Sequence, residues 1–212
     1  METPIKIGFD LDLIAEVFDI QRKDTCQQLR NWLSASYELN QDEQKIFDRI
    51  AADMEEDGDY WNEEELKIQA VGFLFYIANI KVKGQIKVFY ERAMAATING
   101  YQLAVVSDCM VATPRSFSTP KHPYFFLQEF KKGKGEKKDP EAQMLSAMLI
   151  AQHLNSDNKP VYGGYLVGSA WRFTTLIRNE YTVSRRFNAD QRNDLLQIVF
   201  VLRKLKELIL TT

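Results

Sequence analysis

Residues 86–112, with the sequence IKVFYERAMAATINGYQLAVVSDCMVA, contain the signal that decides the fold. Two runs rich in aromatic and β-branched residues flank Asn99-Gly100, a pair that tolerates the positive φ angles of a two-residue type I′ turn. The stretch therefore predicts a β-hairpin whose strands cover residues 86–98 and 101–112.

The expected turn also brings two acidic residues together. Its register places Asp108 opposite Glu91, and both lie in otherwise apolar or small strand sequence. Two neighbouring carboxylates repel each other unless a cation or a proton lies between them. A bound metal ion would remove this conflict. Neutralisation by Arg92 or Lys131, or a bulge that breaks the register, are the alternatives.

The rest of the chain alternates between strands and helices. Asp139-Pro140 supplies an N-cap and a first-turn proline for a helix. Strands joined through a buried helix require a sheet that is covered on both faces. We therefore expect an α/β (α+β mixed) fold in which helices flank a central mixed sheet. The further elements expected are a strand over 124–131, a helix over 139–154, a hairpin of strands over 161–167 and 170–177, and a C-terminal helix that begins at Asn188 or Asp190.

The beginning of the chain has a different character. Residues 1–60 show the apolar spacing of amphipathic helices, and we separate this helical N-terminal region from a main domain over residues 61–212. The main domain opens with a helix that has Asn62 as its N-cap and an apolar stripe that includes Phe73. The N-terminal helices are a candidate surface for a protein partner.

The composition limits the class of protein. With 45% hydrophobic and 26% charged residues, the chain is expected to fold around a core rather than stay disordered. The net charge of -2 excludes the strongly basic composition of ribosomal and chromatin proteins. No apolar run approaches the roughly 18 residues of a membrane helix, and the first residues lack the pattern of a secretory signal. We expect a cytoplasmic protein without membrane contact.

A second acidic position has a lysine two residues further along the chain. In the run 127–131, with the sequence LQEFK, Glu129 and Lys131 share one face of the expected strand. A carboxylate can hold a hard divalent cation, and a neighbouring lysine can orient or deprotonate an attacking water. The same spacing occurs elsewhere in the chain, but only Glu129 ends a buried strand.

These residues resemble the signature of the PD-(D/E)XK nuclease superfamily, which has the restriction-endonuclease-like fold, and within it small bacterial proteins with a helical N-terminal part. The resemblance covers residues 61–210. Asp108 is similar to the first acid of the family, and Glu129-Phe130-Lys131 is similar to its acid-x-lysine motif. Gln143 lies where some members place a glutamine near the site.

The resemblance implies a hydrolase that depends on Mg²⁺ or Mn²⁺ and cleaves phosphodiester bonds of nucleic acid, with DNA favoured over RNA. In this interpretation Asp108 and Glu129 bind the cation, and Lys131 positions the attacking water. Glu91 or Glu63 would hold a second or water-mediated shell.

A glutamate early in the first core helix often completes such sites in the superfamily. The candidates in this chain are Glu63, Glu64 and Glu65. We favour Glu63 because it shares a helix face with Leu66.

Four lysines that follow the acid-x-lysine run would contact phosphates without regard to base sequence. They are Lys132, Lys134, Lys137 and Lys138. The alternative is that this run is an ordinary solvated loop. The competing hypothesis for the whole chain is that the nuclease fold persists without turnover, as a binding or scaffolding module.

Overall fold

The structure is a computed structural model that describes residues 3–116, 119–131 and 139–211. For positions 123, 125–129 and 131 it describes the backbone only. In chain order the elements are β1 (Ile5–Lys6), α1 (Leu11–Val17), β2 (Gln21–Lys23), α2 (Gln27–Leu33), α3 (Gln41–Asp57), α4 (Glu63–Leu66), the π-helix η1 (Lys67–Val71), α5 (Gly72–Ile77), β3 (Lys87–Ile98), β4 (Tyr101–Pro114), β5 (Pro120–Lys131), α6 (Pro140–Asn155), β6 (Val161–Val167), β7 (Ala170–Ile177), β8 (Glu180–Val183), β9 (Phe187–Asn188) and α7 (Arg192–Thr211).

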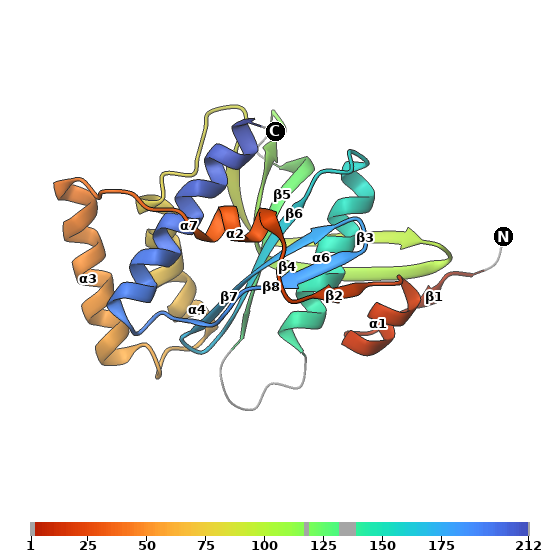
Figure 1. Cartoon of the computed structure of the whole chain (residues 1–212), viewed down its shortest axis with the longest axis horizontal. Helices are drawn as coiled ribbons and strands as arrows, with labels where there is room; N and C mark the ends of the chain where they lie inside the picture. Colours follow the sequence, from red (N-terminus) through yellow and green to blue (C-terminus); the bar gives the residue numbers. More distant parts are fainter. Residues whose placement is uncertain (1–2, 117–118, 132–138, 212) are drawn as a thin grey trace.

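The strands form one mixed sheet. Its main order is β1-β4-β5-β6-β7-β8-β2, while β3 pairs with β4 and β9 pairs with β7. Strands β3, β4 and β5 are antiparallel neighbours, and α6 then crosses over so that β6 runs parallel to β5. The predicted mixed sheet flanked by helices is therefore confirmed (Figure 1).

The hairpin of β3 and β4 forms around the predicted turn. Asn99 and Gly100 have φ angles of 51° and 84°, which are the positive values that a type I′ turn requires. Ile98 pairs with Tyr101, so the expected register is confirmed. The tip of the hairpin extends beyond the body of the molecule on the side of the N-terminus (Figure 1).

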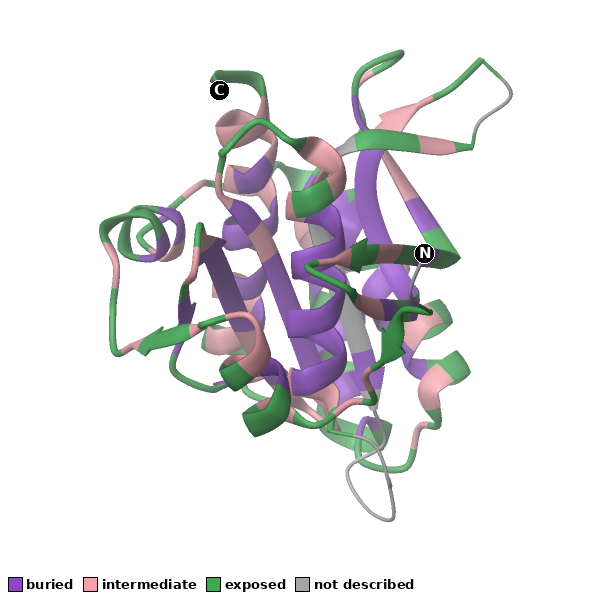
Figure 2. Cartoon of the chain, turned by 90° about the vertical axis from the view of Figure 1, so that its right-hand side faces the viewer, coloured by how far each residue is buried: buried purple, intermediate pink, exposed green. Residues whose placement is uncertain are grey.

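Helices cover both faces of the sheet and enclose two hydrophobic cores. On one face α2, α3, η1, α5 and α7 pack together, and on the other face α6 lies against the sheet beside α1 (Figure 1). The first core includes Trp32, Phe47, Leu74, Phe130 and Leu202. The second core includes Ile14, Phe89, Met94, Val105 and Met148. Since α6 has the sheet on one side and α1 on the other, it is buried from Ala142 to Ala151 (Figure 2).

The N-terminal sixty residues contain the expected helices and, in addition, two strands that the sequence did not predict. Strand β1 pairs in parallel with β4, and β2 pairs in parallel with β8. Strands of two and three residues are too short to show an alternating pattern. Helices α2 and α3 both contact α7, so this region shares the first core with the C-terminal helix.

The helix that follows begins as predicted and then departs from its expected stripe. Asn62 caps α4 by accepting hydrogen bonds from the backbone N–H groups of Glu64 and Glu65. Phe73, predicted to be buried, is 48% exposed. The cause is η1, because the wider turn of a π-helix offsets the faces by about one residue. The other residues of the expected stripe, Leu66, Ala70, Leu74 and Ile77, are buried as predicted, and Val71 is buried in addition.

The remaining differences lie outside the long elements. Strands β4 and β5 extend into the loop expected over 113–123, and β8 and β9 were not predicted. The expected loop over 132–138 lies outside the described residues. No helix in the described part of the chain has the length and the apolar character needed to span a bilayer.

Candidate functional site

Asp108 lies at the point where β4 separates from β5. The backbone pairing of the two strands ends with Cys109 opposite Gln128. Beyond this pair the contact is made by a side chain, because Oδ2 of Asp108 accepts a hydrogen bond of 2.7 Å from the backbone N–H of Phe130. Asp108 is only 8% exposed, so this hydrogen bond is shielded from water.

The same contact joins Asp108 to the acid-x-lysine run. Phe130 is the middle residue of that run, and its own side chain is buried in the first core. In the backbone of β5, Glu129 pairs with Tyr165 and Lys131 pairs with Val167 of β6. The register places Glu129 next to the last β4–β5 pair, on the strand opposite Asp108. The side chains of Glu129 and Lys131 lie outside the described residues, so their predicted contacts stay predictions.

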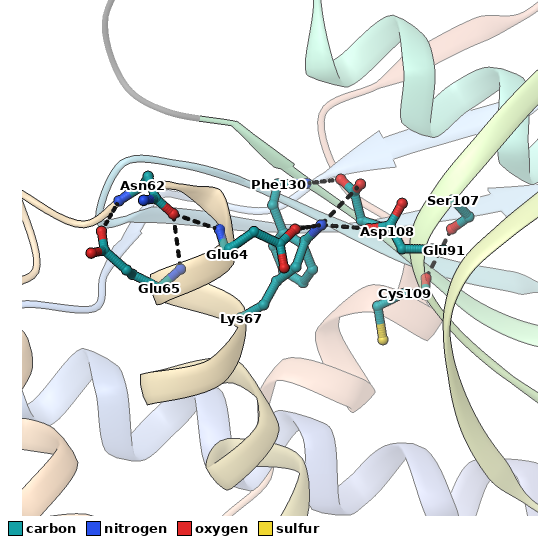
Figure 3. A network of polar contacts seen from close by, with 9 residues as sticks. All are labelled: Asn62, Glu64, Glu65, Lys67, Glu91, Ser107, Asp108, Cys109 and Phe130. Carbon is teal, nitrogen blue, oxygen red and sulfur yellow. Dashed lines mark hydrogen bonds and ion pairs between the residues drawn. The ribbon is translucent and has the colours of Figure 1, made fainter.

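A lysine from η1 lies between the two carboxylates of the hairpin. Nζ of Lys67 is 2.5 Å from Oε1 of Glu91 and 3.6 Å from Oδ1 of Asp108 (Figure 3). It is also 3.3 Å from Oε1 of Glu64, one turn earlier in the helix. The Lys67 side chain is 9% exposed. One ammonium therefore contacts three carboxylates on three different elements and offsets part of their negative charge.

The electrostatic surroundings keep Lys67 charged. Burial by itself lowers the pKa of its ammonium, but the hydrogen bond to Glu91 and the charge of Asp108 act in the opposite direction. Together the carboxylates raise the pKa of Lys67 above its ordinary value. A buried ammonium is stable only with such partners, because an unpaired buried charge costs several kcal/mol.

The predicted repulsion between Glu91 and Asp108 is thus removed in a way that the sequence did not suggest. Arg92, one of the expected neutralising residues, places its guanidinium 6.0 Å from the ring centroid of Phe89. The register also continues on both sides of the acidic pair, since Tyr90 pairs with Cys109 and Arg92 pairs with Ser107.

Glu91 nevertheless has an unusual backbone. Its φ angle is 51°, in the left-handed region that residues other than glycine and asparagine seldom adopt. On the facing strand, the hydroxyl of Ser107 donates a hydrogen bond to the carbonyl of Cys109, so that this contact spans Asp108. Both strands are therefore irregular at the level of the acidic pair.

This irregularity changes the faces that the two strands present. Phe89 and Met94 are five residues apart and would point to opposite faces of a regular strand, yet both belong to the second core. Their cross-strand partners, Met110 and Val105, behave in the same way. In each strand, the positions that face the second core thus change from odd to even or from even to odd once, near Glu91 and Asp108. The pairing register of the two strands is kept.

The structure gives the three candidate glutamates of α4 different surroundings. Glu65 accepts a hydrogen bond of 2.7 Å from the backbone N–H of Asn62 and so completes a capping box. Glu64 contacts Lys67. Glu63, which the sequence favoured, is partly buried at the first position of α4, and its supporting role stays a prediction.

Gln143 is placed away from the Lys67 contacts. It is 7% exposed, and its Oε1 has no hydrogen-bond partner among the described residues. It lines a groove of about 470 Å³ together with Phe9, Met94 and Val105. These neighbours belong to the second core or pack against it, whereas η1 belongs to the first.

The described part of the site suits a cation. Carboxylate oxygens are the ligands that hard divalent cations prefer, and Asp108 and Glu91 already hold the Lys67 ammonium between them. Among the described residues there is no group of three His, Cys, Asp or Glu side chains able to hold a metal ion. A metal site at Asp108 would need a further ligand, for which Glu129 is the predicted residue.

Sequence reasoning missed Lys67, although a signal was present. Lys67 lies four residues before Val71 and seven before Leu74, both of which are buried. It is therefore a charged residue on the apolar side of its helix, which requires a buried partner of opposite charge. That requirement points to the carboxylates of the hairpin.

Comparisons with known proteins do not add to these observations. No model of a known protein family matches the chain. A search among curated proteins found no match either.

Proposed function

We propose that the chain is a metal-dependent nuclease that hydrolyses phosphodiester bonds of nucleic acid, with DNA as the favoured substrate. The observation that carries this proposal is the hydrogen bond of 2.7 Å from the Phe130 backbone to Asp108. It joins the first predicted acid to the middle of the acid-x-lysine run. The contact follows from the pairing of β4 with β5 and places the two parts of the predicted motif on neighbouring strands.

The element order supports the same proposal. A helix that starts at Asn62 precedes a hairpin, a third antiparallel strand, a buried helix and a strand parallel to the third. The resemblance to PD-(D/E)XK nucleases implies a first core helix, a hairpin that ends in the first acid, and a helix after the third core strand. The order of the elements is the one that the resemblance implies, although β4 continues beyond Asp108 to Pro114.

Each proposed role follows from the chemistry of its residue. Asp108 and Glu129 would hold one Mg²⁺ or Mn²⁺, which supplies Lewis-acid stabilisation of the phosphate charge and lowers the pKa of a bound water. The Phe130 backbone N–H fixes the orientation of the Asp108 carboxylate. Lys131 would position the attacking water. Lys67 neutralises Glu91, so that this carboxylate does not repel the substrate phosphate.

Contacts with the nucleic acid are proposed from the sequence. Lysines 132, 134, 137 and 138 lie outside the described residues, and an interaction with phosphates would make binding depend on salt. The supporting role of Gln143 stays a proposal from the sequence, because Gln143, whose amide oxygen has no partner among the described residues, lines the groove beside Phe9 and Met94.

A second candidate function has its own observation. The ammonium of Lys67 lies between Asp108 and Glu91 and reduces their mutual repulsion, so the fold holds this pair without a metal ion. This arrangement favours a catalytically silent binding or scaffolding module that keeps the nuclease fold. Its partner would be nucleic acid or a protein that contacts the N-terminal helices.

One experiment separates the two functions. Single-stranded and double-stranded DNA and RNA are incubated with Mg²⁺ or Mn²⁺ and with wild type, Asp108→Asn or Lys131→Ala at equal concentration. Asp42→Asn and Lys45→Ala are matched controls, because both side chains are more than three-quarters exposed, at 89% and 76%. The nuclease predicts cleavage by wild type and both controls and a loss of at least about 100-fold in the two site variants.

The opposite result is equally informative. If folded wild-type protein cleaves none of the substrates, the silent module is the better description. If Asp108→Asn and Lys131→Ala cleave as fast as wild type, the activity comes from a contaminant and the proposed site is wrong.

A further inference from the structure

An exposed apolar surface lies on η1 and α5, on the side of these helices that faces away from the first core. Ile68 and Tyr76 are 68% and 71% exposed, and Phe73 is exposed beside them. Large apolar side chains that gather on one surface mark an interaction site more often than isolated ones do. We refer to these three residues, together with Ile46 of α3, as the α3–α5 surface.

Two grooves cross this surface and join each other. One has a volume of about 450 Å³ and is lined by the α3–α5 surface and by Gly72. The other has a volume of about 680 Å³, shares Ile46, Gly72 and Tyr76 with the first, and continues to Tyr90 of β3. Because three lining residues are common to both, the hollow extends without a break from η1 past α5 to β3.

The end of this surface at which α3 leads into α4 is acidic. Residues 53–65 contain eight acids and no lysine or arginine. Asp53 and Asp57 follow Ile46 by seven and eleven residues, a spacing that places all three on the same side of α3. Arg49 contacts Asp53, and Asp57 is exposed. The negative charge of this end therefore borders the apolar grooves.

The opposite end, where α5 finishes beside the start of α3, carries lysines. Lys81 lines the larger groove together with Asp42, and Lys83 is exposed in the turn before β3. The two acids at this end, Asp42 and Glu43, each contact a basic side chain, so their charge is offset within the chain. The α3–α5 surface thus has an apolar centre between one acidic and one basic end.

A surface of this kind is complementary to a second copy of itself. In a two-fold symmetric dimer the same patch comes from both chains, so that each end of one patch meets the opposite end of the other. The acidic end of each chain would then lie on the basic end of its partner, with the exposed side chains of Phe73 and Tyr76 in the middle. We propose that the α3–α5 surface joins two copies of this chain into such a dimer. This inference does not depend on the proposed nuclease activity.

The charges favour a second copy over nucleic acid as the occupant. Exposed aromatic side chains such as Tyr76 also suit the bases of a single strand. The acids of residues 53–65, however, repel a phosphate backbone, whereas they attract the lysines of a second chain. A second copy therefore satisfies both the apolar centre and the charged ends.

The test is the mass of the full-length protein in solution, measured by sedimentation velocity over a wide range of concentrations. Wild type is expected to approach twice the mass of one chain as the concentration rises. Tyr76→Glu places a charge in the apolar centre and should raise the dissociation constant at least about tenfold. The control is Leu13→Glu, which alters an exposed leucine of α1 on the other face of the sheet and should dimerise like wild type (Figure 1).

Charge reversal tests how the two ends meet. Lys81→Glu/Lys83→Glu and Asp53→Lys/Asp57→Lys each bring like charges together, and each should raise the dissociation constant at least about tenfold. The variant that combines all four substitutions has opposite charges at each contact again, so its dissociation constant should return towards that of wild type. Damage to the fold would not be rescued in this way. Circular dichroism and thermal unfolding check that every variant is folded.

The results that would overturn the inference are distinct. Wild type that stays a monomer at every concentration would contradict it. A wild-type dimer that persists in Tyr76→Glu and in both charge reversals would show that another surface joins the copies. Failure of the combined variant to recover would show that the charged ends do not meet. If monomeric wild type binds single-stranded DNA, and Tyr76→Glu loses this binding while Leu13→Glu retains it, the surface binds bases instead.

Discussion

The backbone N–H of Phe130 donates to the carboxylate of Asp108, although the two residues belong to different strands and are 22 positions apart. The carboxylate meets the N–H of β5 just beyond the last backbone pair of the two strands. Its other oxygen faces the ammonium of Lys67. Asp108 thus connects β5, which carries the acid-x-lysine run, to Lys67 of η1. Its substitution should therefore affect both the stability of the fold and the proposed cleavage activity.

Substitution of Asp108 can separate these two effects. Asp108→Asn keeps an oxygen that accepts from Phe130, whereas Asp108→Ala leaves a buried N–H without that partner. We expect the free energy of unfolding to be lower in the alanine variant than in the asparagine variant by about 1–2 kcal/mol. Under the proposed nuclease function, both variants should lose cleavage activity. Urea unfolding of the two variants measures the difference, and equal stabilities would show that the hydrogen bond contributes nothing.

Asp194, at the start of α7, should make stability depend on acidic pH. Arg185 contacts its carboxylate at 2.8 Å, and the backbone N–H of Asn188 donates to it at 2.9 Å. The hydrogen bond from Arg185 is the main cause that lowers the pKa of Asp194 below 3.8. Since the folded state then binds the proton less tightly than the unfolded state, the stabilisation is complete above about pH 3.8 and is lost as the pH falls through the folded pKa.

The corresponding variant is Asp194→Asn. At pH 7 we expect it to lower the free energy of unfolding by about 1–2 kcal/mol relative to wild type. The difference should shrink as the pH is lowered below 4 in urea unfolding experiments. The exposed Asp59→Asn is the control. A difference between Asp194→Asn and wild type that stays constant down to acidic pH would contradict this assignment.

Gly163 on β6 allows α6 to approach the sheet closely. A Cβ atom at this position would lie 2.7 Å from Sδ of Met144 and 2.7 Å from Oγ1 of Thr174. Gly163→Ala should therefore lower the free energy of unfolding by about 1–3 kcal/mol through overpacking. Gly8→Ala is the control, since a Cβ there has no atom within 4 Å. Thermal melts that show no difference between the two variants would contradict this packing.

The turn of the long hairpin offers a matched pair of substitutions. Gly100 has a φ angle of 84°, which costs an L-residue other than glycine about 1–2 kcal/mol. Gly100→Ala should therefore destabilise the protein by that amount. Asn99→Gly, at the neighbouring positive φ of 51°, should leave the stability nearly unchanged. Denaturant midpoints compare the two, and an unchanged midpoint for Gly100→Ala would show that the turn relaxes.

The elements that the sequence predicted well are those with local signals. The turn at Asn99-Gly100 and the N-cap at Asp139 each depend on residues a few positions apart. Strands β8 and β9 were missed because they are short and owe their conformation to pairing with β7. The C-terminal helix was expected to begin at Asn188 or Asp190. It begins at Arg192 instead, because Asn188 belongs to β9, which pairs with β7.

The candidate site was predictable only in part, for a physical reason. The opposition of Glu91 and Asp108 follows from the hairpin register, which is a local property. The cation between them comes from Lys67, which is 24 residues before Glu91 and reaches it only through tertiary packing. The π-helical turn of η1 could not be derived from an α-helical period, and Phe73 is the one residue of the expected stripe that it leaves exposed.

The change of faces at Glu91 and Asp108 limits how the hairpin can vary in length. Near its base Val88 faces the first core, whereas Met94, also at an even position, faces the second. Removal of one residue from β3 alone would shift every later side chain of that strand against an unaltered β4. Insertions or deletions on the tip side of Glu91 should therefore be tolerated when two residues are changed in each strand, because this keeps both the pairing and the faces. The acidic pair thus divides the hairpin into two segments whose inward-facing positions differ in parity. A change of length in one strand has to be matched by the same change in the other.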